Sequence, residues 1–92
     1  AAARRDRFRW ERRFTRAALE TLVTPLGVGR VSALEVVSRG VSGRARLLRI
    51  AGDRGTADVA GELRIRRLLG NLPSAMFVVE REGDEVVLPA GR

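Results

Sequence analysis

Along residues 8–15 the side chains alternate, so every second position falls on the same side of an extended chain. That side contains three aromatic residues and one arginine: Phe8, Trp10, Arg12 and Phe14. This pattern predicts a β-strand with an aromatic face. The alternative is a helix over residues 4–23, because apolar residues also recur at every fourth position from Trp10 to Leu22.

A short helix is predicted over residues 16–23. The hydroxyl of Thr15 can cap it by accepting a hydrogen bond from an amide of the first turn. The apolar stripe of this helix contains four residues: Ala18, Leu19, Leu22 and Val23. Pro25 disfavours continuation of the helix, and Gly27 and Gly29 predict a loop after it.

Three strands are predicted in the middle of the chain. Residues 31–38 are rich in β-branched residues and apolar on both faces, which predicts a central strand. Residues 40–43 then form a turn. Residues 44–60 predict a β-hairpin around a Gly-Asp-Arg-Gly turn, with Leu48 and Ile50 on one face.

Residues 61–69 predict a second helix that ends near Gly70. We expect leucines on its core side and arginines on its water side: Leu63, Leu68 and Leu69 on the first, Arg64 and Arg67 on the second. Residues 76–88 predict a second hairpin around a Glu-Gly-Asp turn. The order of elements predicts an α+β fold, a mostly antiparallel sheet of about six strands with two helices packed on one face.

Composition narrows the possible chemistry. The 92 residues carry 18 basic and 11 acidic side chains, a net charge of +7, with no histidine and no cysteine. This excludes nucleophiles activated by histidine, His/Cys zinc sites and disulfides, and we predict no cofactor and no metal. No apolar run is long enough to span a membrane. Because the chain starts with three alanines and no methionine, we expect it to be a segment of a longer protein.

The positive charge is concentrated at one end of the chain. Residues 1–16 carry seven arginines against two acidic residues, a net charge of +5. We expect residues 1–7 to form a basic, flexible arm and residues 8–92 a single module. The arm suits polyanions such as nucleic acid, although a solvated chain end is the favoured interpretation.

The most distinctive local stretch is residues 39–44, in which two glycines lie between two arginines. Glycine permits close approach of a ligand, and arginine can hold a carboxylate, a phosphate or sugar hydroxyls. The alternative is a tight turn whose arginines pair with Glu35, Asp53 or Asp58. Trp10 also has two interpretations. It is either a stacking platform for a sugar ring or a base, or an aromatic residue of the core.

Two other features give weaker evidence of a functional role. Glu35 lies within an apolar strand, where burial would raise its pKa, but pairing with an arginine is favoured over a catalytic role. The glycines at residues 27–30 lack the strand before and the helix after that a phosphate-binding loop requires.

Three segments occur in a defined order: residues 38–44 read SRGVSGR, residues 65–70 read IRRLLG and residues 72–77 read LPSAMF. They follow a predicted strand that contains a tryptophan. In this order they make residues 8–88 resemble the SpoIID/LytB family of bacterial cell-wall proteins. The resemblance implies action on peptidoglycan outside the cytoplasmic membrane. Family members include a sporulation lytic transglycosylase that cleaves denuded glycan strands and a modifier that enhances an amidase.

The chain also departs from this family. The family's catalytic glutamate lies upstream of the tryptophan strand and its Gly/His-rich segment lies downstream of the last hairpin, and neither has a counterpart here. The resemblance therefore implies a non-catalytic segment, with no catalytic residue, that supports binding or remodelling of peptidoglycan. Its implied partners are glycan strands or other domains of the parent protein, and six residues match recurrent family positions as candidate glycan contacts: Arg39, Ser42, Gly43, Arg44, Arg66 and Ser74.

Two alternatives from other classes stay open. The first is a small nucleic-acid-binding domain that uses residues 4–16, although no known nucleic-acid-binding signature is present. The second is a structural interaction module that docks on another domain of its parent. It would present an exposed apolar patch and bind no small molecule.

Overall fold

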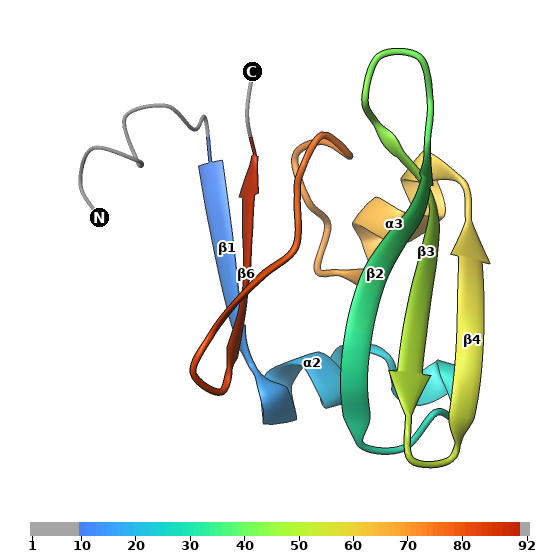
Figure 1. The fold of residues 1–92 in the computed structure, drawn as a ribbon, viewed down its shortest axis with the longest axis vertical. Helices are drawn as coiled ribbons and strands as arrows, with labels where there is room; N and C mark the ends of the chain where they lie inside the picture. The colour runs from blue at the N-terminus through green and yellow to red at the C-terminus, as the bar shows by residue number, and fades with distance from the viewer. Residues whose placement is uncertain (1–9, 91–92) are drawn as a thin grey trace.

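The computed structural model describes residues 10–90, which form an α+β fold as predicted (Figure 1). In chain order the elements are β1 (Trp10–Thr15), α2 (Arg16–Leu22), the 3-10 helix η1 (Thr24–Leu26), β2 (Val31–Arg39), β3 (Ala45–Gly52), β4 (Gly55–Ala60), α3 (Glu62–Leu68), β5 (Glu80–Glu82) and β6 (Glu85–Ala90). All strand pairs of these residues are antiparallel. The predicted basic arm at residues 1–7 lies outside the described residues.

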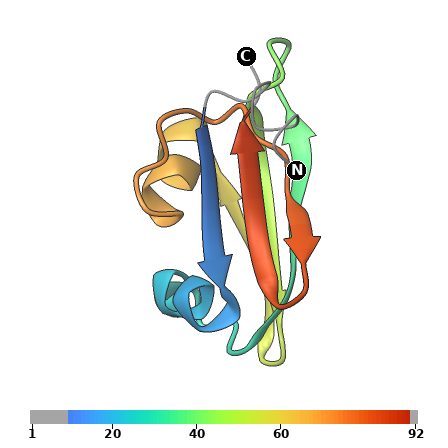
Figure 2. The ribbon, with the colours of Figure 1, turned by 90° about the vertical axis from the view of Figure 1, so that its left-hand side faces the viewer.

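The strands divide between two three-stranded sheets, in the orders β1-β6-β5 and β2-β3-β4, where we expected one sheet of about six strands. Figure 2 shows the first sheet lying in front of the second. The first sheet joins the two ends of the described chain, because Trp10 pairs with Ala90 and Thr15 pairs with Glu85. Local patterns predict hairpins between successive strands, whereas pairing of distant segments depends on the whole fold.

The apolar sides of the sheets and helices form one core. Both helices lie on the same side of the two sheets in Figure 2, and α3 packs against β3 and β4. The buried core cluster contains residues from α2, β2, β3, β4, α3 and β6 and from the connecting loops: Leu19, Val23, Val28, Val31, Ala45, Leu48, Ile50, Val59, Ile65, Leu69, Leu72, Ala75, Phe77, Leu88 and Ala90.

The strand predicted at the N-terminal end is confirmed over Trp10–Thr15, and the helical alternative for this segment is wrong. Trp10 and Phe14 are partly buried against the core. The predicted cap of α2 is also confirmed, because the Thr15 hydroxyl accepts a hydrogen bond of 3.1 Å from the backbone N–H of Ala18. Ala18 itself is exposed and does not belong to the apolar stripe.

The strand expected at the centre of a sheet, β2, lies instead at an edge. β3 pairs with both β2 and β4, and therefore occupies the central position. Only Val31 of the nine residues of β2 is buried. β-Branched residues favour extended backbone, but they do not specify how many neighbours a strand has.

Two expectations for the C-terminal half also change. Leu63 of α3 is 52% exposed, while Ile65 is fully buried. Ile65 and Leu69 are four residues apart and therefore share the core side of the helix. β5 begins only at Glu80, and of the residues before it Phe77 makes a single bridge to Ala90.

Candidate functional site

The turn between β2 and β3 projects from one end of the molecule (Figure 1). Its backbone is cross-linked by two hydrogen bonds, from Gly40 N–H to the Arg44 carbonyl at 2.9 Å and from Gly43 N–H to the Gly40 carbonyl at 3.0 Å. Gly43 has a φ of +87°, in the left-handed region that favours glycine. Val41 at the tip is fully exposed. The turn is therefore an ordered protrusion with one apolar side chain at its end.

Both arginines of the turn make internal hydrogen bonds. Arg39 Nη1 donates to the Gly43 carbonyl at 2.9 Å, and Arg44 Nη1 donates to Ser42 Oγ at 3.0 Å. Arg44 Nε also lies 3.6 Å from Glu62 Oε1 at the start of α3. These contacts orient both arginines. Because a guanidinium carries five N–H donors, each arginine also keeps donors for a ligand.

The structure brings Ser74, another predicted residue, close to the base of this turn. Ala45 N–H, just after the turn, donates to the Ala75 carbonyl at 2.8 Å. The Ser74 hydroxyl accepts a hydrogen bond of 3.3 Å from Met76 N–H and so shapes the segment that follows α3. A β-carbon on Gly43 would lie 4.0 Å from Met76 Cε. Four turn residues and Ser74 therefore belong to one end of the molecule.

Arg66, the sixth predicted residue, has a different environment. Its Nε donates to the Leu72 carbonyl at 2.9 Å, and the contact is partly buried. Leu72 N–H in turn donates to the Arg66 carbonyl at 3.0 Å. Arg66 thus holds the loop after α3 against the helix, and its position assigns it to this internal contact rather than to the projecting turn.

The acidic residues proposed as partners of the turn arginines contact other groups. Asp58 forms two hydrogen bonds with Arg49, at 2.8 and 3.0 Å, and this contact lowers the pKa of Asp58 from its ordinary 3.8. The pKa of Arg49 is raised, mainly by Asp58 and to a smaller extent by the charge of Glu35. Glu35 is exposed and lies opposite Arg49 in the sheet, so it is no buried acid. Asp53 accepts a hydrogen bond from the Arg30 backbone at 2.9 Å.

Two other candidate features have structural roles in the described chain. The rings of Trp10 and Phe77 lie 6.5 Å apart at an interplanar angle of 54°, and Trp10 is partly buried against the core. This arrangement fits the core reading of the tryptophan. Gly29 has a φ of +79°, and its α-carbon approaches Asp53 and Arg54 so closely that a β-carbon would clash. Gly29 therefore permits close packing of this loop on the β3–β4 turn.

The sequence of the chain matches a known family model over residues 1–90, that of a domain of unknown function, DUF8618. The chain belongs to this family. No curated protein and no solved structure matches it. Membership of this family does not by itself indicate an activity.

Two classes of feature are missing from residues 10–90. None of their helices is long and apolar enough to cross a membrane. No cluster of three or more acidic side chains in this part of the chain could hold a metal ion.

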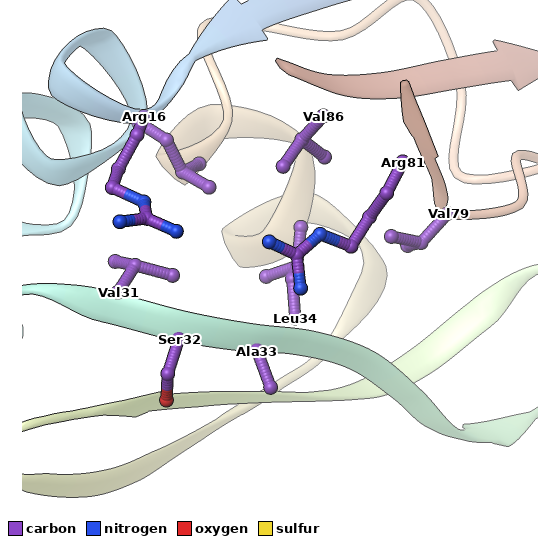
Figure 3. Close-up of a pocket in the computed structure, with 9 residues that line it drawn as sticks. Arg16, Val31, Ser32, Ala33, Leu34, Val79, Arg81 and Val86 are labelled. Atoms are coloured by element: carbon purple, nitrogen blue, oxygen red, sulfur yellow. The ribbon is translucent and has the colours of Figure 1, made fainter. Parts of the chain in front are cut away.

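Sequence reasoning did not find a second candidate site, a groove between α2, β2 and the β5–β6 hairpin (Figure 3). Its lining is mostly apolar with two arginines: Arg16, Leu19, Val31, Ser32, Ala33, Leu34, Val79, Arg81 and Val86. Arg16 begins α2 and Arg81 lies in β5, at nearly opposite ends of the chain. No local sequence signal could have brought them together.

Proposed function

We propose that this chain is a non-catalytic, glycan-binding module of a peptidoglycan-remodelling protein similar to the SpoIID/LytB family. The observation that carries the proposal is the ordered resemblance of residues 38–44, 65–70 and 72–77 to that family. Under this proposal the module works in the cell envelope, outside the cytoplasmic membrane. It supports a parent protein of the sporulation or amidase-enhancing kind, with glycan strands as its ligand.

The chemistry of the β2–β3 turn supports this ligand class. Muramic acid in a glycan strand without stem peptides carries a free lactyl carboxylate, and arginine is the side chain best suited to bind a carboxylate with two parallel hydrogen bonds. Arg39 and Arg44 flank the turn, and internal bonds orient both guanidinium groups. Exposed Val41 offers an apolar contact for a sugar ring between them. We assign direct contacts to Arg39, Ser42, Gly43 and Arg44.

Arg66 and Ser74 take part in this proposal as positioning residues. Arg66 fixes the loop after α3 through the Leu72 carbonyl. Ser74 lies in the segment whose Ala75 carbonyl accepts a hydrogen bond from Ala45 at the base of the turn. The two residues hold the surface beside the turn in place without contacting the glycan.

The test is an amide NMR titration of the labelled chain with soluble denuded glycan strands at near-physiological salt. We expect shifts at residues 39–44 and 72–76. The Arg39→Ala/Arg44→Ala variant should bind at least about tenfold more weakly, since two charge-assisted contacts are lost. The charge-matched control is Arg64→Ala/Arg67→Ala on the exposed side of α3, which should bind like the wild type.

An RNA oligomer serves as the parallel titrant. Unchanged glycan affinity in a folded Arg39→Ala/Arg44→Ala variant would overturn the assignment of the turn. Shifts with RNA alone, confined to residues 1–16 and lost as salt rises, would replace glycan binding with nucleic-acid binding.

A further inference from the structure

The two sheets are covered differently on their two sides. Figure 2 shows both helices on one side, whereas β2 and β5 lie on the other side with no helix over them. β2 and β5 are also the edge strands of their sheets on this side. The groove described above lies between these two edges, and Arg16 and Leu19 of α2 also line it. We call it the open seam, defined by its lining residues on α2, β2, β5 and β6 and by Val79 just before β5.

The free edge of β2 is the first feature of the open seam. Within residues 10–90, β2 pairs only with β3, and its other edge has one polar contact, from Val31 N–H to Glu20 Oε2 at 2.9 Å. The register of β2 is regular over residues 33–36, between two irregularities. Unpaired N–H and C=O groups of an edge strand are a template for another extended chain. A short added strand can therefore pair with this regular stretch.

The lining of the open seam is the second feature. Leu34, Val79 and Val86 are partly buried and form an apolar surface between the sheets. Such a surface favours the apolar side chains of a bound segment, since their burial removes them from water. The regular stretch of β2 borders this surface, because Ala33 and Leu34 belong to both.

The charge of the open seam is the third feature. Arg16 and Arg81 extend into the groove from opposite elements and point toward each other in Figure 3. Neither guanidinium has a hydrogen-bond or ion-pair partner within residues 10–90, and none of the lining residues is acidic. Two unpaired cations beside an apolar surface complement a ligand that has both apolar groups and carboxylates.

We propose that the open seam binds an extended peptide segment, which adds as a strand to the free edge of β2. Alternate side chains of the segment contact Leu34, Val79 and Val86, and its carboxylates pair with Arg16 and Arg81. A second copy of this chain fits less well, because pairing of two β2 edges would gather four arginines without a lining carboxylate. The inference goes beyond glycan binding, since it concerns a peptide partner at a separate surface.

The probe is a seven-residue peptide with blocked ends. It has glutamate at its first and last positions, valine at its third and fifth, and threonine between. Alternation in a strand puts both glutamates and both valines on the same face. We expect it to shift the amide signals of residues 33–36 and to bind folded Arg16→Gln/Arg81→Gln at least about tenfold more weakly. The matched control, Arg64→Gln/Arg67→Gln, removes the same charge from α3 and should change affinity less than about twofold.

Backbone methylation of the probe tests the strand geometry. Alternate residues of a strand direct their N–H groups to the same edge, so only one edge faces β2. We make one peptide methylated on nitrogen at its odd internal positions and one methylated at its even positions. Strand addition predicts that one of the two peptides loses binding and that the other keeps it.

Several results would overturn the proposal. The first two are the absence of binding at millimolar peptide and equal affinity of a peptide with glutamine in place of glutamate. The others are equal sensitivity of binding to both methylation patterns, and dimerisation of the free chain through β2 in sedimentation experiments. Glycan binding is detected by amide shifts at residues 39–44, and peptide binding by amide shifts at residues 33–36. Either proposal can therefore fail while the other holds.

Discussion

Apolar residues and arginines occur both on the side of the molecule covered by helices and in the open seam. They differ between the two regions in burial and in hydrogen-bond partners. On the covered side Ile65 and Leu69 are fully buried, and Arg66 donates to the Leu72 carbonyl. In the open seam Leu34 is only partly buried, and Arg81 has no partner within the described residues. An arginine committed to a backbone carbonyl supports the fold, whereas one without a partner is available to a ligand.

The β2–β3 turn is intermediate between these two regions. Arg39 and Arg44 each make one hydrogen bond inside the turn, and Arg44 also approaches Glu62. These bonds orient the guanidinium groups without consuming their donors. A turn of this kind loses little conformational entropy when it binds, because its side chains are already ordered.

The largest expected effect comes from truncating one leucine-sized side chain on each side. Ile65→Ala should lower the free energy of unfolding by about 2–5 kcal/mol, because the deletion leaves a cavity in the core. Leu34→Ala should cost less than about 2 kcal/mol, since the side chain is only partly buried. Urea denaturation measures both. A cost for Leu34→Ala equal to that of Ile65→Ala would mean that the open seam is as much a part of the core as the covered side.

A second comparison replaces an arginine on each side by methionine. Arg66→Met should destabilise the fold by about 1.5–3 kcal/mol, because the Leu72 carbonyl loses a charge-assisted donor. Arg81→Met should change the free energy of unfolding by no more than about 0.5 kcal/mol. Thermal unfolding followed by circular dichroism separates the two. Equal costs would contradict the division into structural and available arginines.

The cap of α2 affects both regions, because this helix contributes Leu19 to the core and Arg16 to the open seam. Thr15→Ala should cost about 1 kcal/mol, since the N–H of Ala18 loses its acceptor. The control is Thr21→Ala, which removes a hydroxyl that donates to the Ala17 carbonyl inside the same helix. It should be close to neutral, because alanine is the better helix former. Amide hydrogen exchange would localise the first effect to α2, and uniform loss of protection would argue against a local cap.

The smallest effect lies on the exposed pair of Arg49 and Asp58, outside both regions. The pKa of Asp58 is lowered in the folded state, mainly by its hydrogen bond to Arg49. Its contribution to stability is therefore present above the ordinary value of 3.8 and is lost as the pH falls below it. Asp58→Asn should have a slightly lower Tm than the wild type at neutral pH, and the difference should vanish at pH 2. A difference that persists at pH 2 would show that the ion pair is not its cause.

Local signals predicted the elements well where one stretch of chain contains all the information. The alternation around Trp10 predicts β1, Thr15 predicts the start of α2, and the Gly-Asp-Arg-Gly turn predicts the hairpin of β3 and β4. The prediction failed where a residue's environment depends on a distant partner. Leu63 has an apolar side chain, as core residues do, but it lies on the exposed side of α3.

The candidate site divides in the same way. The arginines of residues 39–44 are adjacent in sequence, so their shared turn can be predicted from two glycines. Their neighbourhood with Ser74 depends on the hydrogen bond between Ala45 and Ala75, which no local pattern specifies. Local patterns also do not predict that Arg16 and Arg81 line the same groove.

The sequence alone determined the α+β class, the order of the elements and the turn at residues 40–43, because hydrophobic period and turn residues act over a few positions. Tertiary structure decided that the strands form two sheets, that β2 is an edge strand and that two arginines from distant segments line one groove. Those properties depend on which distant segments bury each other's apolar surface. That choice minimises the exposed apolar area of the whole chain and is written in no single segment.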